Sequence, residues 1–183
     1  MSENNKIPQL IKGGIHTDQR GQISFVNDMK FDNIERFYII SNSAENPLRA
    51  WQGHKIDNKY FYCIQGSIKV HYVKIDNWES PSKDLKVESV ILSATESVVL
   101  HIPEGYANAI ESLEVGSKLI SFSTLPLDRT AEDDVRFDSN QWSVVKRSAG
   151  ELFLPICHAV SVSICCSLRN CLPYIPKENP TSY

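Results

Sequence analysis

The stretch of sequence that decides the fold is LRAWQGHKIDNKYFYCIQGS, from Leu48 to Ser67. It opens with a cluster of polar side chains and continues as an apolar, aromatic run that ends at Gly66. A second stretch, VLHIPEGYANAI, runs from Val99 to Ile110 and turns at a glycine of its own. Two such blocks are typical of the two halves of a small β-barrel that holds a ligand.

Short runs of β-branched and aromatic residues recur along the chain between turn signals. Their spacing of about 8 to 12 residues predicts roughly nine strands before residue 128 and no convincing helix there. We therefore expect an all-β jelly roll, the double-stranded β-helix, rather than an α/β fold. The segment DRTAEDDV that follows is expected to form one helical turn with Asp128 as its N-cap.

The run SIKVHYVKI, from Ser67 to Ile75, places apolar side chains at every second position. This alternation predicts an antiparallel strand with one buried face and one solvated face. His71 lies among lysines on the second face, so we expect it at the surface. We expect His101 to be an ordinary strand residue and His16 to lie in a loop.

Composition excludes several classes of function. The 183 residues carry a formal net charge of −3, so no basic field would recruit nucleic acid or an anionic membrane. The first residues, MSENNK, are polar and lack the apolar core of a signal peptide. No stretch reaches the length of about 18 to 20 apolar residues that a spanning helix needs. These features favour the cytoplasm as the location.

The end of the chain differs from the rest. From Ser148 onward charged residues are sparse, and the segment between Leu152 and Leu168 is interrupted by Pro155 and by serines. We expect a barrel domain over residues 7–146 and a tail over 147–183 that lies outside it. The tail is interpreted as loosely ordered or foreign to the domain; the alternative is a membrane or partner anchor.

Cysteines crowd this tail and form no C-x-x-C pair, so no metal site is predicted there. They are Cys157, Cys165, Cys166 and Cys171.

Barrels of this pattern often hold a metal, and here the ligand positions can be compared. A metal-binding cupin presents His-x-His, then a Glu, then a His in a later P-x-G-x-x-H turn. The corresponding positions in this chain are Gln52, His54, Asn58 and Asn108. Amide oxygens are weak ligands for transition metals. We therefore predict no functional metal and no other cofactor.

The order of several short motifs carries a resemblance over residues 8 to 143. The motifs are D-x-R-G, an arginine before a lysine that opens an aromatic strand, I-L-S-A, I-P-E-G-Y-A-N-A-I and R-F-D-x-x-x-W. Together they resemble the cupins that act on dTDP-sugars: the dTDP-4-dehydrorhamnose 3,5-epimerases and the related 3,4-ketoisomerases, called WxcM-like. The resemblance implies a jelly-roll homodimer, a nucleotide-sugar ligand and a role in making surface polysaccharide.

Residue by residue, the resemblance assigns roles to three cations. Arg20 matches the arginine of D-x-R-G, which contacts the nucleotide diphosphate, in related dimers from the partner chain. Arg49 and Lys59 match residues implied to hold the 4-keto sugar. A cation beside the C4 oxygen would stabilise the enolate that forms when a proton leaves C3 or C5.

The departures from the epimerase pattern fall on the proton carriers. The general base of R-G-x-H is replaced by Gln52, and an amide cannot accept a carbon-bound proton near neutral pH. The later histidine is replaced by Asn108. The catalytic tyrosine falls between Leu125 and Leu127, where there is no phenol, and the aspartate that supports the base is expected to be missing.

The ketoisomerases carry R-G-x-H-x-H-K instead, and here Arg49, His54 and Lys55 match. His54 is thus the candidate base, with a structural histidine as the alternative. Gln52, Lys55 and Asn108 are candidate substrate contacts. Trp51 lies within the same cluster and could either stack on the ligand or belong to the core.

The sequence therefore supports two hypotheses. The first is a metal-independent epimerase or ketoisomerase of a dTDP-4-keto-6-deoxyhexose, with His54, Arg49 and Lys59 as catalytic residues. The second is a cupin that binds a nucleotide sugar or a glycan without turning it over, since the amides of Gln52 and Asn108 are good partners for hydroxyls.

Overall fold

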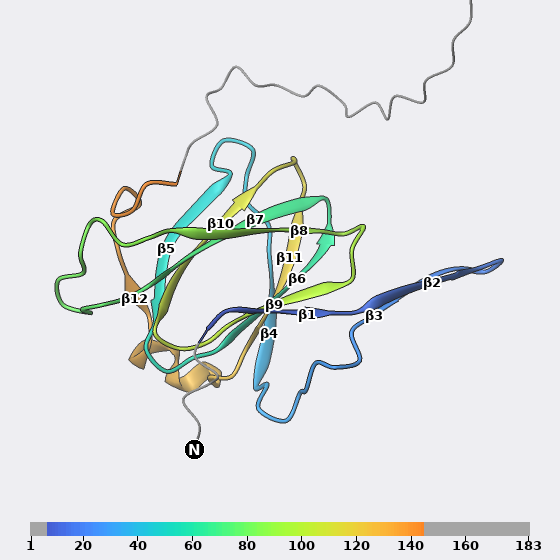
Figure 1. The fold of residues 1–183 in the computed structure, drawn as a ribbon, viewed down its shortest axis with the longest axis horizontal. Helices are drawn as coiled ribbons and strands as arrows, with labels where there is room; N and C mark the ends of the chain where they lie inside the picture. Colours follow the sequence, from blue (N-terminus) through green and yellow to red (C-terminus); the bar gives the residue numbers. More distant parts are fainter. Residues whose placement is uncertain (1–6, 145–183) are drawn as a thin grey trace, which may run out of the picture. The chain divides into compact units, whose positions relative to one another are not determined.

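In the computed structural model, which describes residues 7–144, two five-stranded antiparallel sheets form the walls of a barrel (Figure 1). The first sheet has the order β1 (Gln9–Lys12), β9 (Val98–Ile102), β6 (Lys59–Gln65), β11 (Lys118–Ser123), β4 (Arg36–Ile40). The second has the order β12 (Val135–Arg136), β5 (Leu48–His54), β10 (Tyr106–Ser112), β7 (Ser67–Lys74), β8 (Glu88–Ser93). The predicted all-β jelly roll is confirmed.

The inner faces of the two sheets enclose the main core. Alternate residues of β7 and β10 point inward, so that Ile68, Val70 and Ile110 are at most 3% exposed. Phe61 and Leu119 meet them from the first sheet. This is the period of two that antiparallel pairing requires when one face of each sheet is apolar.

The outer face of the second sheet is also buried, which corrects the prediction of a solvated face. Trp51, Val73 and Ala109 form a second apolar cluster there, covered by Trp142. His71 lies on this face, 2% exposed, with Nε2 3.0 Å from a carboxylate oxygen of Glu111. The alternation in the sequence was interpreted correctly, but it could not show that the chain returns at residues 137–144 to cover the strand.

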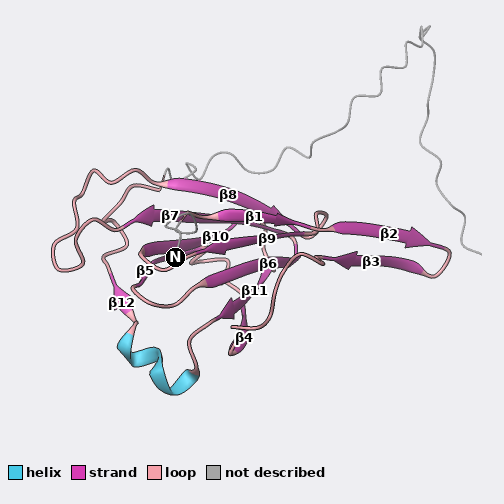
Figure 2. Cartoon of the chain, turned by 60° about the horizontal axis from the view of Figure 1, so that its bottom comes forward, coloured by secondary structure: helices cyan, strands magenta, loops and turns pink. Residues whose placement is uncertain are grey.

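A separate hairpin, β2 (Gly14–Asp18) and β3 (Gly21–Phe25), extends away from the barrel (Figures 1 and 2). Gly21 adopts a positive φ of 128° at the turn. His16 is in β2, so its expected position in a loop is wrong. Ile23 and Phe25 are 60% and 40% exposed. The hairpin therefore presents apolar surface that residues 7–144 leave exposed.

The expected helical turn is a 3-10 helix, η1 (Leu127–Glu132). Its N-cap residue is Pro126 and there is no side-chain cap, so the assignment of Asp128 as N-cap is wrong. Within residues 7–144 no helix has the length and apolar character to cross a bilayer.

The tail and its four cysteines lie outside the described residues. Cys63 is described, and it is buried in the main core as a free thiol.

Candidate functional site

Two adjoining hollows lie between the inner faces of the sheets. The outer hollow, about 470 Å³, extends to residues of η1 such as Leu127 and Thr130. The inner hollow, about 260 Å³, reaches the main core at Phe61 and Ile110. Six residues line both hollows, and they mark the boundary between them: Tyr38, Arg49, Gln52, His54, Lys59 and Arg136.

Strand β5 supplies three of these six residues: Arg49, Gln52 and His54. Its pairing with β10 shifts register: Asn108 lies opposite Gln52, but Ile110 lies opposite Arg49. An extra residue in one strand of an antiparallel pair changes the face that the following side chains occupy. The bulge therefore allows Arg49 to line the same hollows as Gln52 and His54 although it is three residues from Gln52.

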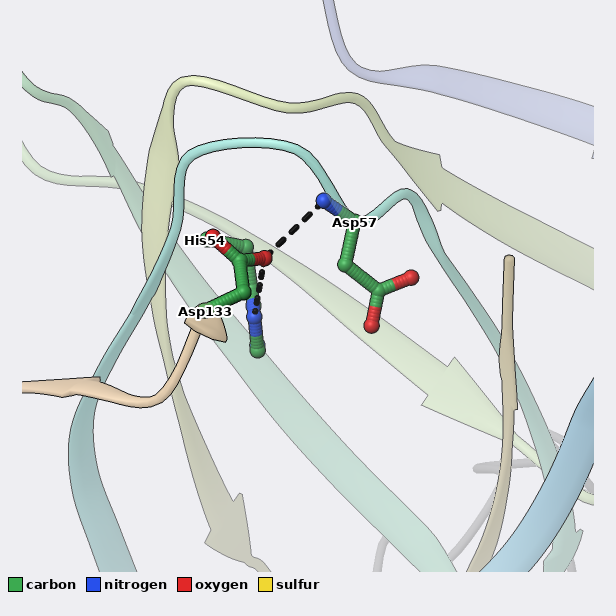
Figure 3. Close-up of side chains that lie close together, drawn as sticks. All are labelled: His54, Asp57 and Asp133. Carbon is green, nitrogen blue, oxygen red and sulfur yellow. Dashed lines mark hydrogen bonds and ion pairs between the residues drawn. The ribbon is translucent and has the colours of Figure 1, made fainter. Parts of the chain in front are cut away.

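His54 lies at the end of β5 against a buried aspartate (Figure 3). Its Nδ1 is 3.4 Å from Oδ2 of Asp133, an ion-pair contact longer than a well-formed hydrogen bond. The Nε2 atom has no hydrogen-bond partner among the described residues, and the side chain is 7% exposed. With Nδ1 toward the carboxylate, Nε2 is left to exchange a proton with a ligand.

Asp133 is held by the backbone of the loop between β5 and β6. Its carboxylate accepts hydrogen bonds from the amides of Lys55, Ile56 and Asp57 at 2.6, 3.2 and 2.9 Å. Burial alone would raise the pKa of Asp133, but the His54 ring and these amides stabilise the carboxylate and place its pKa below the ordinary value. Asp133 is thus a carboxylate partner of His54, a contact that was not predicted from the sequence. The expectation that the epimerases' own aspartate is missing stays a prediction.

Lys59 is the second buried charge beside His54. Its Nζ is 2.5 Å from Oδ2 of Asp57, and both side chains are at most 3% exposed. Asp57 also accepts hydrogen bonds from Ser123 Oγ at 2.7 Å and from the Leu125 amide at 3.1 Å. A buried ammonium with a fixed partner is a preorganised positive charge, which is what a developing oxyanion requires.

Arginines add further positive charge around the boundary. Arg49 is exposed and has no hydrogen-bond or ion-pair partner among the described residues. Arg36 donates to the carbonyl oxygen of Leu125 at 2.9 Å, and Arg136 pairs with Asp134 at 3.1 Å. Lys59, Arg36 and Arg136 therefore already have partners within the protein. Among the described residues that line the hollows, Arg49 is the arginine available to bind an anion.

The amide side chains of Gln52 and Asn108, which stand where the epimerases carry histidines, differ in their environment. The Gln52 side chain donates to Asp134 Oδ1 at 2.8 Å and is thereby fixed. Asn108 is 5% exposed, lines the inner hollow and has an Nδ2 without a partner. Because an unpaired buried donor is costly, the Asn108 amide is suited to bind an acceptor on a ligand.

Two predicted substrate contacts lie apart from the hollows of their own chain. Arg20 is at the turn of the β2–β3 hairpin, with an 86% exposed side chain paired with Asp18 at 2.6 Å. Lys55 lines neither hollow, and its ammonium lies 5.5 Å from the centre of the Trp78 ring. The structure thus brings together His54, Arg49 and Lys59, but does not bring Arg20 or Lys55 to them within this chain.

Trp51 contributes to the wall of the inner hollow, yet its ring belongs to the outer apolar cluster. The residue is 2% exposed and its ring lies edge-on to Trp142, with 5.3 Å between ring centroids. Of the two interpretations from the sequence, this packing favours the core. Ligand contact by Trp51 stays a prediction.

Sequence reasoning missed most of the acidic and aromatic members of the site. Asp57 and Asp133 were assigned no role from the sequence, because their carboxylates bind amides more than 60 positions away. Arg36 and Tyr38 alternate on β4 and line the outer hollow. That alternation was a usable signal, since every second residue of a strand shares a face.

A metal fits the site poorly. Donor atoms of His54, Asp57 and Asp133 lie within 4.8 Å of one another, a spacing that a cation could use. However, the ammonium of Lys59 already contacts Asp57, and three backbone amides occupy the Asp133 carboxylate. A divalent ion would have to displace these bonds and would be repelled by the ammonium.

Comparison with known proteins agrees with this fold. The class is a cupin-type barrel of the kind found in nucleotide-sugar epimerases and ketoisomerases. The family model described as "FdtA: WxcM-like, C-terminal" matches residues 3–141, and the chain belongs to this family. Comparison with curated protein sequences gives no match.

Solved structures show the same fold. A double mutant of the QdtA 3,4-ketoisomerase from Thermoanaerobacterium thermosaccharolyticum, in complex with TDP, is 25% identical with a TM-score of 0.57; the match covers 75% of this chain and 90% of that one. The rmlC epimerase of Mycobacterium tuberculosis is 20% identical with a TM-score of 0.56, covering 71% and 68%. The WlaRB TDP-quinovose 3,4-ketoisomerase of Campylobacter jejuni is 17% identical with a TM-score of 0.56, covering 76% and 98%.

The low pKa of Asp133 predicts a loss of stability in acid. A depressed pKa means that the unfolded chain takes up the proton first, so the contribution is complete above the unfolded pKa of about 3.9 and is lost as pH falls below it. In urea titrations from pH 6 to pH 3, we expect Asp133→Asn to be less stable at pH 6 and to lose less free energy of unfolding on acidification. The matched control is Asp84→Asn, an exposed site that should follow the wild type. Equal pH slopes in all three proteins would contradict this account.

Proposed function

We propose that the protein is an isomerase of a dTDP-4-keto-6-deoxyhexose, acting as an epimerase or a 3,4-ketoisomerase. The observation that carries the proposal is the buried His54–Asp133 pair beside the Lys59 ammonium, at the boundary of the two hollows. Family membership and the TDP complex of the QdtA mutant support the nucleotide-sugar class. We propose a cytoplasmic role in surface-polysaccharide synthesis, following the resemblance.

The proposed reaction begins with a proton transfer from carbon. Nε2 of His54 takes the proton from the carbon beside the C4 ketone, and the electron pair moves onto the C4 oxygen as an enolate. Lys59 and Arg49 stabilise that oxyanion, while Asp133 stabilises the imidazolium. An epimer forms when a second acid donates a proton to the opposite face of the same carbon; His54 then releases its proton to water, and the acid regains one from water. The 3-keto isomer forms when the C3 hydroxyl proton moves to the C4 oxygen and His54 returns its proton to carbon C4.

The outer hollow suits the nucleotide diphosphate. Arg36, Arg49 and Arg136 surround it, and guanidinium groups bind phosphate oxygens in pairs. Tyr38 stands on the wall opposite β5 and supplies the phenol of the site, as a donor to the sugar or as a proton carrier. We propose that Gln52 also contacts the nucleotide sugar, through its amide oxygen.

The test is hydrogen exchange into carbon. Incubation of the protein with dTDP-4-keto-6-deoxyglucose in D2O should remove the C3 or C5 proton signal from the NMR spectrum. His54→Asn should slow this exchange by about 10²- to 10⁴-fold, because a positioned general base contributes that much. Its affinity for TDP should change little.

A matched control is His71→Asn, which removes the other buried histidine paired with a carboxylate. Since His71 lines neither hollow, exchange per folded molecule should stay at the wild-type rate. Exchange that survives in His54→Asn would refute the catalytic assignment. TDP binding by the wild type without any exchange would instead support the second candidate, a nucleotide-sugar binding protein, which the unpartnered Asn108 amide favours.

We propose that this chemistry needs no metal, because the Lys59 ammonium already supplies the positive charge that a Lewis acid would bring. Dialysis against EDTA should leave the exchange rate unchanged, and addition of Zn²⁺, Fe²⁺ or Ni²⁺ should not increase it. Loss of exchange with EDTA, restored by one of these ions, would reverse the proposal.

We also propose a homodimer in which Arg20 reaches the outer hollow of the partner subunit. Arg20 lies on a projecting hairpin whose Ile23 is 60% exposed. The outward-facing side chains Phe37 and Ile39 of β4 are 63% and 54% exposed, an apolar surface suited to a second copy of the chain.

Mixed dimers test the exchange of Arg20. Arg20→Ala and His54→Asn should each be nearly inactive. When they are unfolded and refolded together, about a quarter of wild-type activity should return, since half of the random dimers carry one intact site of two. No recovery, with dimers confirmed by light scattering, would show that Arg20 acts within its own chain or not at all.

A further inference from the structure

A further hollow, of about 480 Å³, lies at the β8 edge of the second sheet. Its lining shares no residue with the two hollows of the proposed active site. A volume of this size is typical of pockets that bind small molecules. We call it the β8-edge hollow, and its polar lining consists of Tyr72, Lys74, Lys86, Glu88 and Tyr106.

Strand register places the β8-edge hollow on the same face of the second sheet as His54. Tyr106 of β10 lies opposite His54 of β5 on one side and opposite Lys74 of β7 on the other. Directly opposed residues of an antiparallel sheet share a face, so these three side chains belong to one face. His54 lines the first two hollows, whereas Tyr106 and Lys74 line the β8-edge hollow. The two sites are therefore neighbours on one face and have separate linings.

Two phenols and a carboxylate give the β8-edge hollow its hydrogen-bonding groups. Tyr72 and Tyr106 lie edge to face, with 6.3 Å between ring centroids. Burial raises the pKa of both phenols, and the Glu88 carboxylate raises it further, so both stay protonated and can donate. Tyr72 donates to Oε2 of Glu88 at 3.4 Å, a long contact that leaves the carboxylate able to accept from a ligand. These groups suit a ligand that carries several hydroxyls.

The charged groups of the β8-edge hollow are two ammonium groups and one carboxylate. Lys86 pairs with Glu88 at 3.1 Å, and its side chain is 83% exposed, so this pair is largely screened by solvent. Lys74 is exposed and has no hydrogen-bond or ion-pair partner among the described residues. An unpaired lysine ammonium binds a phosphate as a point charge. The balance of charge therefore favours an anionic ligand.

The remaining wall of the β8-edge hollow is apolar and is formed by Ile7, Pro8 and Leu85. Such a wall can pack against the carbon face of a sugar ring. A nucleobase, by contrast, is bound by stacking on an open aromatic face. Tyr106 is only 7% exposed, so its ring offers no such face. Hydroxyl-binding groups, an apolar wall and a cation together fit a phosphorylated sugar.

We propose that the β8-edge hollow is a second binding site, and that its ligand is a sugar phosphate. Lys74 binds the phosphate, Glu88 accepts a hydrogen bond from a sugar hydroxyl, and the phenols of Tyr72 and Tyr106 contact the ring oxygens. The site goes beyond the proposed isomerase function and does not depend on it, because none of its residues takes part in that reaction.

An NMR titration of the isotope-labelled protein tests the site, with glucose 1-phosphate as the probe. The backbone amide signals of Tyr72, Lys74 and Glu88 should shift and saturate in the millimolar range. Inorganic phosphate should need about a tenfold higher concentration, because it lacks the ring that the hollow contacts. Shifts confined to Arg49 and His54 would place the ligand in the first hollows and overturn the proposal. Equal affinities for glucose 1-phosphate and inorganic phosphate would overturn it as well, and so would tighter binding of dTMP at the same signals.

Two lysine variants test the charge. Lys74→Ala should weaken binding of glucose 1-phosphate by about tenfold, as expected when a hydrogen bond to a charged group is lost. The matched control is Lys83→Ala, which removes an exposed ammonium that does not line the hollow. Its affinity should equal that of the wild type. An equal loss in both variants would mean that the ligand responds only to overall charge, and would reject the site.

Tyr72→Phe tests the contact with the sugar ring. Loss of this hydroxyl should weaken glucose 1-phosphate by about 3- to 10-fold and leave inorganic phosphate unaffected. The amide spectrum outside the hollow should match that of the wild type, which shows that the variant is folded. Unchanged affinity for glucose 1-phosphate would contradict a sugar bound against the phenols.

Discussion

The site depends on a reciprocal arrangement of two buried carboxylates around the loop that joins β5 and β6. Asp133 accepts the amides of the loop at residues 55–57, while Asp57 within the loop accepts the amides of Thr124 and Leu125. Asp133 also contacts the imidazole of His54, and Asp57 contacts the ammonium of Lys59. A single network therefore fixes the backbone of the loop together with His54 and Lys59.

The two sheets of the barrel contribute different residues to the hollows. One wall supplies Lys59 and Tyr38, and the other supplies His54, Gln52 and Asn108. Arg49, Lys59 and Arg136 line both hollows, and the lining of the inner one also includes core residues such as Phe61 and Ile110.

The sequence revealed the fold more completely than the site. Glycine turns and alternating strands predict the barrel, and motif order predicts that His54, Arg49 and Lys59 share a site, because these signals are local. The contacts of Asp57 and Asp133 could not be predicted, since the Asp133 carboxylate accepts bonds that span 76 to 78 positions and the Asp57 carboxylate accepts bonds that span 66 to 68 positions. The burial of His71 was missed for the same reason: it contacts Glu111 and Trp51, and Trp142 from far along the chain packs on Trp51.

The position of Asp133 has a consequence for the order of events during synthesis. All the strands that enclose the hollows, apart from β12, precede residue 124, whereas the carboxylate that organises the β5–β6 loop follows η1. A ribosome thus delivers nearly all the strands of the barrel before it delivers the carboxylate that binds the β5–β6 loop. The loop amides at residues 55–57 therefore acquire their carboxylate partner only after the last long strand has been made.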